Sequence, residues 1–471
     1  MKDEYPRTAG LTKQLEDQSA MKKLLGSTLA LAMLVPAFAN AELLKNFKAS
    51  GSIDIDAVSA NNVGDLNTSN YDHLNTVQTR VLVNGDWDLL DDVHAGVTLN
   101  KNNRTYGAAA ESLTGVQGAT VFQQATVKID KLFGMIDAKL GRQFYGEAGD
   151  LVIYYGPRND YGLTVTALDG GRFDWNGENV GVTVLGAKIA PASALGVKDT
   201  GDTNLWGVDV HVKASENIGG AVYGYSKKTI NSGNAVLTGN GVVGNDKLYV
   251  VGVKGKATMG GAWIKGEIAK NFGVNRTGIR SDGGYTFTGN YTGMAARVNG
   301  GVKADLNNIG ALTGWADAGI GSGGSTANRS FQAIAGDYRP GGIAGRFWTG
   351  NGSAVDLGST SGLTATVNGG TLGNRVDVGA GVKVTPAALA KLTAGLSWWN
   401  YRVQNAAGLP AGAKGNKFLG NEYDLDLNWA HSENVSVSAG VGSFQPGRAY
   451  IVSQAAINPA TLCYADFNVK F

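Results

Sequence analysis

The chain has 471 residues, of which 17% are charged, and its 41 lysines and arginines nearly balance its 39 aspartates and glutamates. This balance argues against a nucleic-acid partner, because no basic excess is present to neutralise phosphates. The 70 glycines and only 9 prolines favour many strands joined by tight turns, since glycine supplies the positive φ that hairpin turns need.

Cysteine and histidine predict neither a disulfide framework nor a metal centre. Cys463 is the only cysteine, so no intramolecular disulfide can form. The four histidines, His73, His94, His211 and His431, are too scattered to predict a metal site by spacing. We therefore expect neither a metal nor another cofactor.

The N-terminal region predicts export. Met21-Lys22-Lys23 is a basic start, residues 24–35 are mostly apolar, and Ala39 and Ala41 supply the small residues of a signal peptidase site. The alternative is a buried core helix. Residues 1–20 precede this signal, so we interpret them as an upstream extension, with 21–41 as the signal peptide and 42–471 as the exported domain. That domain contains no run of ~20 apolar residues long enough for a membrane-spanning helix.

Residues 76–89 show the pattern that dominates the exported domain. Val77 and Val81 stand at odd positions, whereas Gln78 and Arg80 stand at even positions. A period of two over more than ten residues predicts a β-strand with one apolar and one polar face. The pattern breaks at 90–92 and resumes, which indicates a hairpin, and it recurs at 206–213, 375–384, 423–429 and 434–441.

The strand length favours a transmembrane barrel over a soluble sandwich or solenoid. Strands of soluble sheets average ~5–6 residues, whereas a tilted strand needs ~9–11 residues to cross the hydrocarbon layer. A bilayer forbids unpaired backbone groups, so such strands must close into an antiparallel barrel with its apolar face toward lipid. The sequence therefore predicts an all-β transmembrane barrel.

Connectors, aromatic residues and the C-terminus agree with this interpretation. Short turns are predicted at 130–134, 176–179, 215–217, 305–309 and 432–434, and they alternate with much longer segments, as periplasmic turns alternate with extracellular loops. Trp87, Trp175 and Trp429 stand on the apolar face beside short turns, where an interfacial girdle is expected. The last amphipathic strand ends at Phe471, which we interpret as a signal for the barrel-assembly machinery.

The strand count is about 18, within a range of 16–20. We interpret residues 321–373 as one long external loop. The alternative is that 331–337 and 343–348 form a further hairpin, which would give 20 strands.

Residues 125–134 lead into Leu140-Gly141-Arg142-Gln143 and then Gly149-Asp150. This resembles the alginate-export family of outer-membrane barrels and its porin-like relatives, in which a hairpin closed by Leu-Phe-Gly precedes Gly-Arg-Gln and Gly-Asp. The resemblance implies an 18-stranded barrel. Leu151 follows Gly149-Asp150, where that family usually continues with another arginine, so a polyanion substrate does not carry over directly.

The predicted lumenal wall carries equal numbers of acidic and basic residues. Arg80, Arg297 and Arg375 belong to the basic set. A pathway for a polyuronate should carry an excess of one sign, whereas a balanced wall suits a general aqueous pore.

A barrel of ~16–18 strands leaves an open channel, so a loop is expected to narrow it. The loop from Phe144 to Tyr161 is our candidate, because it carries Glu147, Asp150, Arg158 and Asp160. The alternative is a solvated external loop. Strict alternation points Arg142 toward lipid, unless a bulge at Gly141 turns it into the pore.

These features predict an outer-membrane porin for passive diffusion of small hydrophilic solutes and ions. An enzyme is disfavoured, because neither Gly-x-Ser-x-Gly nor His-Glu-x-x-His occurs. Export of an alginate-like polyanion and a structural or adhesive surface barrel stay open as alternatives. The expected partners are outer-membrane lipid, the barrel-assembly machinery and small polar solutes, and a homotrimer is one assembly that such a pore could form.

Overall fold

The computed structural model describes residues 45–64, 66–69, 73–106, 120–190, 202–230, 245–275, 278–279, 285–286, 289–324, 327–347, 371–407, 415–450 and 457–471. The predicted extension 1–20 and signal peptide 21–41, with Ala39 and Ala41, lie outside these residues. None of the helices in the described part of the chain is long and apolar enough to cross a membrane.

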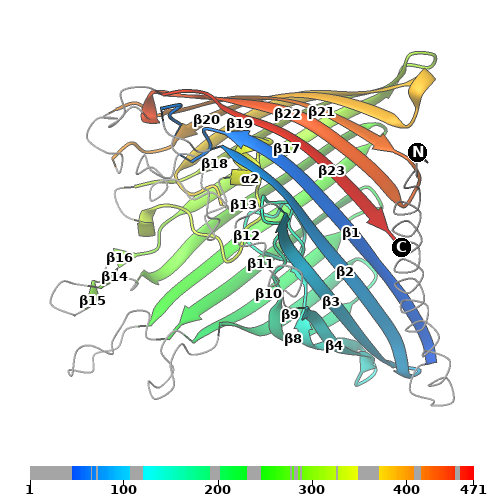
Figure 1. The fold of residues 1–471 in the computed structure, drawn as a ribbon. Coiled ribbons are helices and arrows are strands. Elements are labelled where there is room, and N and C mark those ends of the chain that lie inside the picture. The colour runs from blue at the N-terminus through cyan, green and yellow to red at the C-terminus, as the bar shows by residue number, and fades with distance from the viewer. Residues whose placement is uncertain are drawn as a thin grey trace, which may run out of the picture.

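The described residues form one closed antiparallel barrel of 18 long strands (Figure 1). The fold class and strand number predicted from the sequence are thereby confirmed. The strands of the wall are β1 (Lys45–Asn61), β2 (Leu74–Leu90), β3 (Val93–Tyr106), β4 (Val121–Leu132), β5 (Ile136–Gln143), β8 (Leu168–Asn176), β9 (Val180–Ala190), β10 (Thr203–Lys213), β11 (Ile218–Thr229), β12 (Asp246–Met259), β13 (Ala262–Asn275), β17 (Met294–Asp305), β18 (Gly310–Gly321), β19 (Arg375–Pro386), β20 (Leu392–Val403), β21 (Phe418–Ala430), β22 (Val435–Pro446) and β23 (Ala460–Lys470).

Shorter elements lie between the wall strands. They are β6 (Tyr145–Gly146), β7 (Tyr154–Tyr155), β14 (Gly278–Ile279), β15 (Tyr285–Thr286), β16 (Gly289–Asn290), the α-helix α2 (Ile343–Phe347), and the 3₁₀ helices η4 (Ala327–Arg329), η6 (Ala387–Leu389) and η8 (Arg448–Tyr450). The pair Val274↔Asn290 joins β16 to the loop-side end of β13.

The barrel closes where the first strand meets the last. β1 pairs with β2 on one side and with β23 on the other, from Ser52↔Lys470 to Asn61↔Thr461. Figure 1 shows β1, in blue, running beside β23, in red. Closure pairs both edges of the sheet, which a bilayer requires because it offers backbone groups no water.

Alternation along each strand sets the two faces of the wall. On β12, Tyr249, Val251 and Val253 are 41%, 46% and 48% exposed and point outward. Their neighbours Leu248 and Val250 point inward and are buried. Apolar side chains therefore cover the outside of the barrel, as expected for a lipid-facing surface.

The short turns lie at or close to their predicted positions, although the turn predicted at 130–134 spans 133–135. β4 ends at Leu132 and β5 begins at Ile136, and the positive φ of Phe133 (55°) and Gly134 (83°) closes this hairpin. The other predicted turns lie between β8 and β9, β10 and β11, β17 and β18, and β21 and β22. Trp175 and Trp429 stand beside such turns and are 42% and 38% exposed.

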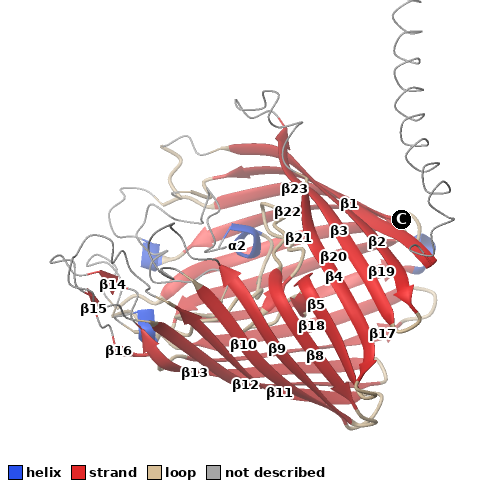
Figure 2. Ribbon diagram, turned by 90° about the horizontal axis from the view of Figure 1, so that it is seen from below, coloured by secondary structure: helices blue, strands red, loops and turns tan. Residues whose placement is uncertain are grey.

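The segment between β18 and β19 differs from its prediction as one external loop or a further hairpin. Its described part folds into the barrel and contains η4 and α2 rather than strands. Figure 2 shows α2 inside the ring of strands. The inward position of this segment is favourable because Ile343, Ala344 and Phe347 become fully buried against inward-facing residues of the wall.

Candidate pore constriction

Two segments narrow the interior of the barrel, and we call them the first inward segment (residues 144–167) and the second inward segment (residues 327–347). The first contains the small hairpin of β6 and β7. Gly146 and Gly149, with φ of 85° and 87°, adopt a conformation that side chains with a Cβ rarely accept. They allow the chain to turn back into the barrel instead of extending away from it.

The first inward segment rests on an apolar part of the inner wall. Leu151, Val152 and Ile153 are 0%, 1% and 3% exposed. The cluster that buries them includes Leu168, Leu185, Leu205, Leu248 and Val250 of β8, β9, β10 and β12. Burial of this much apolar surface fixes the segment to one side of the lumen.

The second inward segment packs against the C-terminal strands of the wall, next to the place where β23 meets β1. The cluster around α2 includes Trp399, Tyr401, Phe444 and Leu462 of β20, β22 and β23. Glu422 of β21 accepts hydrogen bonds from the backbone N–H groups of Ile343 at 2.6 Å and Ala344 at 3.1 Å. The carboxylate thus satisfies donors that a helix start otherwise leaves unpaired.

The two inward segments join each other through their backbones. Ile153 and Ala335 form a parallel β-bridge. The N–H of Tyr154 donates to the carbonyl of Ala335 at 2.9 Å, and the N–H of Ala335 donates to the carbonyl of Val152 at 3.0 Å. The segments therefore form a continuous structure inside the wall.

Arg158 reinforces this junction. Its guanidinium donates to the carbonyls of Gly336 at 2.8 Å and Tyr154 at 2.7 Å, and it pairs with Asp337 at 3.3 Å. Burial lowers the pKa of Arg158 from its ordinary value, and Asp337 opposes this shift. Arg158 thus lies within the predicted loop, but it holds the two inward segments together and is only 3% exposed.

The acidic residues of the first inward segment have different surroundings. Asp150 pairs with Lys254 of β12 at 2.9 Å. Burial raises the pKa of Asp150, although Lys254 counteracts this effect. Glu147 is exposed to solvent and forms no ion pair with the described residues. Asp160 is buried, accepts a hydrogen bond from the N–H of Thr164 at 2.8 Å and lies 3.6 Å from Arg339.

The predicted wall arginines support the inward segments. Arg80 pairs with Asp54 at 2.9 Å and donates to the carbonyl of Arg158 at 2.7 Å. Arg297 pairs with Asp317 at 2.6 Å and donates to the carbonyl of Gly149 at 2.9 Å.

Arg375 differs from the other two wall arginines in its burial. Its side chain is fully buried, pairs with Asp377 at 2.6 Å and lies 5.8 Å from the Tyr338 ring centroid. It therefore contributes to the packing of the second inward segment rather than to a surface that faces water.

Arg142 lies apart from this group. The pairing of β4 with β5 continues without a shift from Thr126↔Gly141 to Ala125↔Arg142, so no bulge rotates the strand there. Arg142 stays on the outward face with Leu140 and pairs with Asp169 at 2.8 Å. Its inclusion among the pore-lining candidates is corrected accordingly.

The structure adds residues that the sequence did not predict. Arg346 of α2 pairs with Asp56 at 2.7 Å and Asp466 at 3.1 Å, across β1 and β23, and lies 4.4 Å from the Tyr464 ring centroid. Asp424 accepts a hydrogen bond from the N–H of Gly342 at 3.3 Å. The described residues contain no group of three or more His, Cys, Asp or Glu placed to bind a metal ion.

No protein-family model matches the chain, and no curated protein is similar to it in sequence. The resemblance to the alginate-export family is therefore not shown. Solved structures nevertheless share the fold. The outer membrane protein OprD from Pseudomonas aeruginosa has a TM-score of 0.53 at 9% identity, over 91% of this chain and 94% of that chain. OpdQ from the same organism has a TM-score of 0.54 at 11% identity, over 92% of this chain and 99% of that chain.

OccAB1 from Acinetobacter baumannii also has a TM-score of 0.54, at 10% identity, over 91% of this chain and 97% of that chain. At such low identity, these similarities establish the fold of the barrel and not its solute.

Proposed function

We propose that the protein is an outer-membrane porin, a water-filled channel for passive diffusion of small hydrophilic solutes and ions. The observation that carries this proposal is a closed wall with apolar side chains outside and two anchored segments that narrow its interior. A segment fixed by apolar burial and buried ion pairs defines a constriction of constant shape. Such a constriction suits selection of solutes by size and charge.

The arrangement of charge inside the barrel supports small solutes over a polyanion. Arg80, Arg297 and Arg375 each pair with an aspartate on the wall. A polyuronate would need unpaired cations along its path to replace lost hydration. Arg375 and Asp377 are fully buried, and Arg80 and Arg297 are mostly buried, so none of these three guanidinium groups is available to bind a passing polyanion.

One neighbouring structure suggests a solute to test. OccK2 from Pseudomonas aeruginosa, with a TM-score of 0.52 and 9% identity over 91% of this chain and 98% of that chain, was solved in complex with glucuronate. We therefore include small sugar acids among the solutes proposed for this channel. The signal peptide at 21–41, the assembly role of Phe471 and a homotrimeric state belong to the same proposal.

Planar-bilayer recordings of the purified protein test the proposal directly. We expect stable conductance steps, and a reversal potential in a KCl gradient that shows only weak preference between K⁺ and Cl⁻. Uptake into proteoliposomes should be fast for monosaccharides and slow for oligosaccharides. A folded barrel that is electrically silent would instead favour a structural or adhesive role.

A further inference from the structure

The outer surface of the barrel carries a cluster of cations at the loop-side ends of β9, β11 and β12. Lys188, Lys228 and Lys247 all stand on the outward face of their strands. The strand register places them in one row that also includes Asn204 of β10: Lys188 lies opposite Asn204, Asn204 opposite Lys228, and Lys228 opposite Lys247. We call these four residues the basic row.

The positive charge of the basic row is only partly neutralised within the chain. Lys188 pairs with Asp202. Lys228 and Lys247 are direct cross-strand neighbours, and like charges in that position repel each other. Among the described residues neither forms an ion pair, and the connecting residues 231–244 contain no charged side chain in the sequence.

Aromatic side chains follow the basic row two positions further into the strands. Trp206, Tyr249 and Phe272 are 63%, 41% and 46% exposed on the outward face. The register runs from Trp206 to Ser226, then to Tyr249 and to Phe272. Aromatic rings of this kind concentrate at the level of lipid headgroups, so the lysines are placed at the height of headgroup phosphates.

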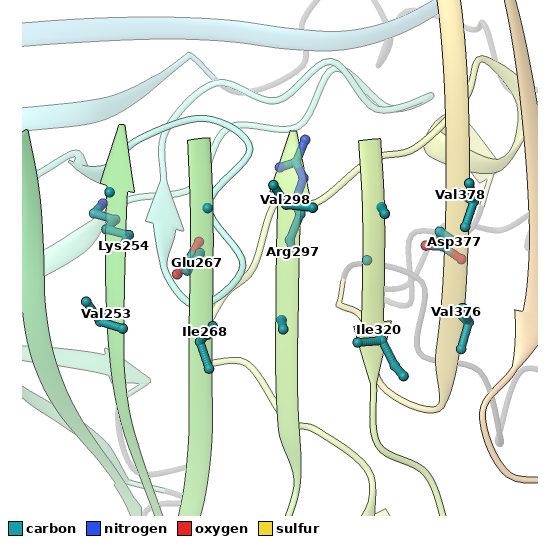
Figure 3. A pocket seen from close by; sticks show the side chains of 15 residues that line it. Val253, Lys254, Glu267, Ile268, Arg297, Val298, Ile320, Val376, Asp377 and Val378 are labelled. Carbon is teal, nitrogen blue, oxygen red and sulfur yellow. The ribbon is translucent and has the colours of Figure 1, made fainter. Parts of the chain in front are cut away.

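An apolar hollow lies on the membrane-facing wall toward β19. Its volume is about 570 Å³, and its lining residues belong to β12, β13, β17, β18 and β19 (Figure 3). Val253, Ile268 and Val298 border it, while Gly255 and Ala318 leave it open. Val253 lies six residues along β12 from Lys247, or about 20 Å at ~3.4 Å per residue.

A row of adjacent lysines occurs on this side of the barrel, whereas other outward cations of the loop-side rim bond to a neighbour: Arg142 pairs with Asp169, and Arg402 donates to Asn400. The outward positions at the loop-side ends of β21, β22, β23 and β1 carry Asn421, Gln445, Ser443, Thr461 and Asn61, which are all uncharged. Lysine is thus absent from the outward loop-side ends of these four strands.

We infer that the outward face of β9 to β13 binds a phosphorylated lipid of the outer leaflet. Its phosphates contact Lys228 and Lys247, with Lys188 at the flank, because ammonium groups bind phosphate as point charges. Its acyl chains lie over Trp206 and Tyr249 and reach the apolar hollow. This inference rests on the proposed location of the barrel in an outer membrane.

Binding of bis-phosphorylated lipid A to the full chain in detergent tests the inference, with native mass spectrometry as the readout. The double variant K228Q/K247Q should bind at least about tenfold more weakly than the wild type, because each surface cation contributes to the attraction of anionic lipid. Lipid A from which both phosphates have been removed should bind the wild type as weakly as the variant does.

The control variant is K256Q/K265Q. Lys256 and Lys265 are also direct cross-strand neighbours, on the same β12–β13 hairpin, but they face the lumen. This variant should bind lipid A as the wild type does. Heat-dependent gel mobility shows whether each barrel is folded.

Equal affinity of wild type and K228Q/K247Q would overturn the inference, and so would displacement of lipid A by millimolar inorganic phosphate. Channel recordings on the same preparations separate it from the proposed function. Conductance without lysine-dependent lipid binding refutes the lipid site alone. Lysine-dependent binding in a silent barrel refutes the porin and leaves the lipid site standing.

Discussion

Charged side chains inside the barrel divide into those that hold the inward segments and those that face water. Arg80 and Arg297 donate to backbone carbonyls of the first inward segment, and Arg158 ties that segment to the second. Glu147 is instead exposed at the first segment's surface. A permeating ion is therefore expected to respond to Glu147 more strongly than to the buried arginines.

Replacing Glu147 with glutamine should shift the channel toward anions, because it removes an exposed negative charge at the narrowest region. The reversal potential in a KCl gradient measures this shift. Asp86→Asn is the matched control, since Asp86 is an exposed carboxylate on the inward face of β2. If the control moves the reversal potential as far as E147Q does, the constriction is elsewhere.

Asp150 gives the same region a dependence on pH. Burial raises the pKa of this carboxyl above its ordinary value, so it takes up a proton at a higher pH than an exposed aspartate would. Protonation removes the negative partner of Lys254, and acidification should therefore increase anion preference. Reversal potentials recorded at falling pH check this, and D150N should show anion preference already at neutral pH and a flatter response.

The sequence predicted part of this site, for a physical reason. Glu147, Asp150, Arg158 and Asp160 were predicted to lie at the constriction because charges of both signs in a loop that narrows a pore can orient polar solutes. The partners themselves could not be predicted. Asp337 lies 179 residues from Arg158 in the sequence, and no local pattern joins them. Whether the acidic residues control permeation stays a prediction.

At the scale of elements, the alternation of apolar and polar residues predicted the strands correctly where one face of the wall meets lipid and the other meets water. The run Leu248-Tyr249-Val250-Val251 departs from it, because apolar residues occupy both faces. Leu185 and Leu205 make the same departure on β9 and β10. These inward apolar residues are the signal, overlooked in the sequence, that something covers the inner wall.

The second inward segment lacked any such signal of its own. Residues 343–347 form one helical turn, too short for a helical period to be recognised. Its inward position depends on Glu422 and on the aromatic cluster of β20 and β22. Only the closed barrel brings those residues together.

Replacing Arg158 with glutamine should loosen the junction between the two inward segments. The variant loses a buried guanidinium that binds the carboxylate of Asp337 and the backbone carbonyls of Tyr154, Ala335 and Gly336. Breaking such a buried ion pair costs about 3–5 kcal/mol. We expect larger and noisier single-channel currents from a barrel that keeps the β-sheet signal of the wild type in far-UV circular dichroism at room temperature.

The matched control for R158Q is Arg402→Gln. Arg402 is exposed and bonds only to Asn400 on its own strand among the interactions described. Its replacement should leave currents unchanged. Wild-type currents from R158Q would mean that the junction does not limit the pore.

At the scale of the whole molecule, stability resides in a continuous ladder with lipid on one side. Val210 and His211 are adjacent on β10 and face opposite sides. Lysine at Val210 should destabilise the barrel by about 2–4 kcal/mol if the residue lies near the midplane. Lysine at His211 should cost far less, because that side chain is already 46% exposed on the lumenal side. Urea unfolding in lipid vesicles compares the two, and equal costs would contradict the assignment of faces.

Phe471 takes part in closing the ladder. Its backbone exchanges two hydrogen bonds with Gly51, at 2.7 Å and 3.1 Å. Its ring covers Gly51, where any added Cβ would collide with it. Deleting Phe471 should lower the amount of folded protein in the outer membrane, as measured by immunoblotting of membrane fractions. Phe471→Tyr is the control and should assemble normally. A normal amount of the deletion variant in the outer membrane would show that assembly does not require Phe471.

Because β1 and β23 pair like any other neighbours, the order of strands around the wall is a cycle. A cut in the turn at 215–217, combined with a peptide linker from residue 471 to residue 45, would preserve the same set of pairings. The pairings alone therefore do not determine between which two strands the chain must begin and end. Every strand of the wall has two hydrogen-bonded neighbours, including the first and the last strand of the chain.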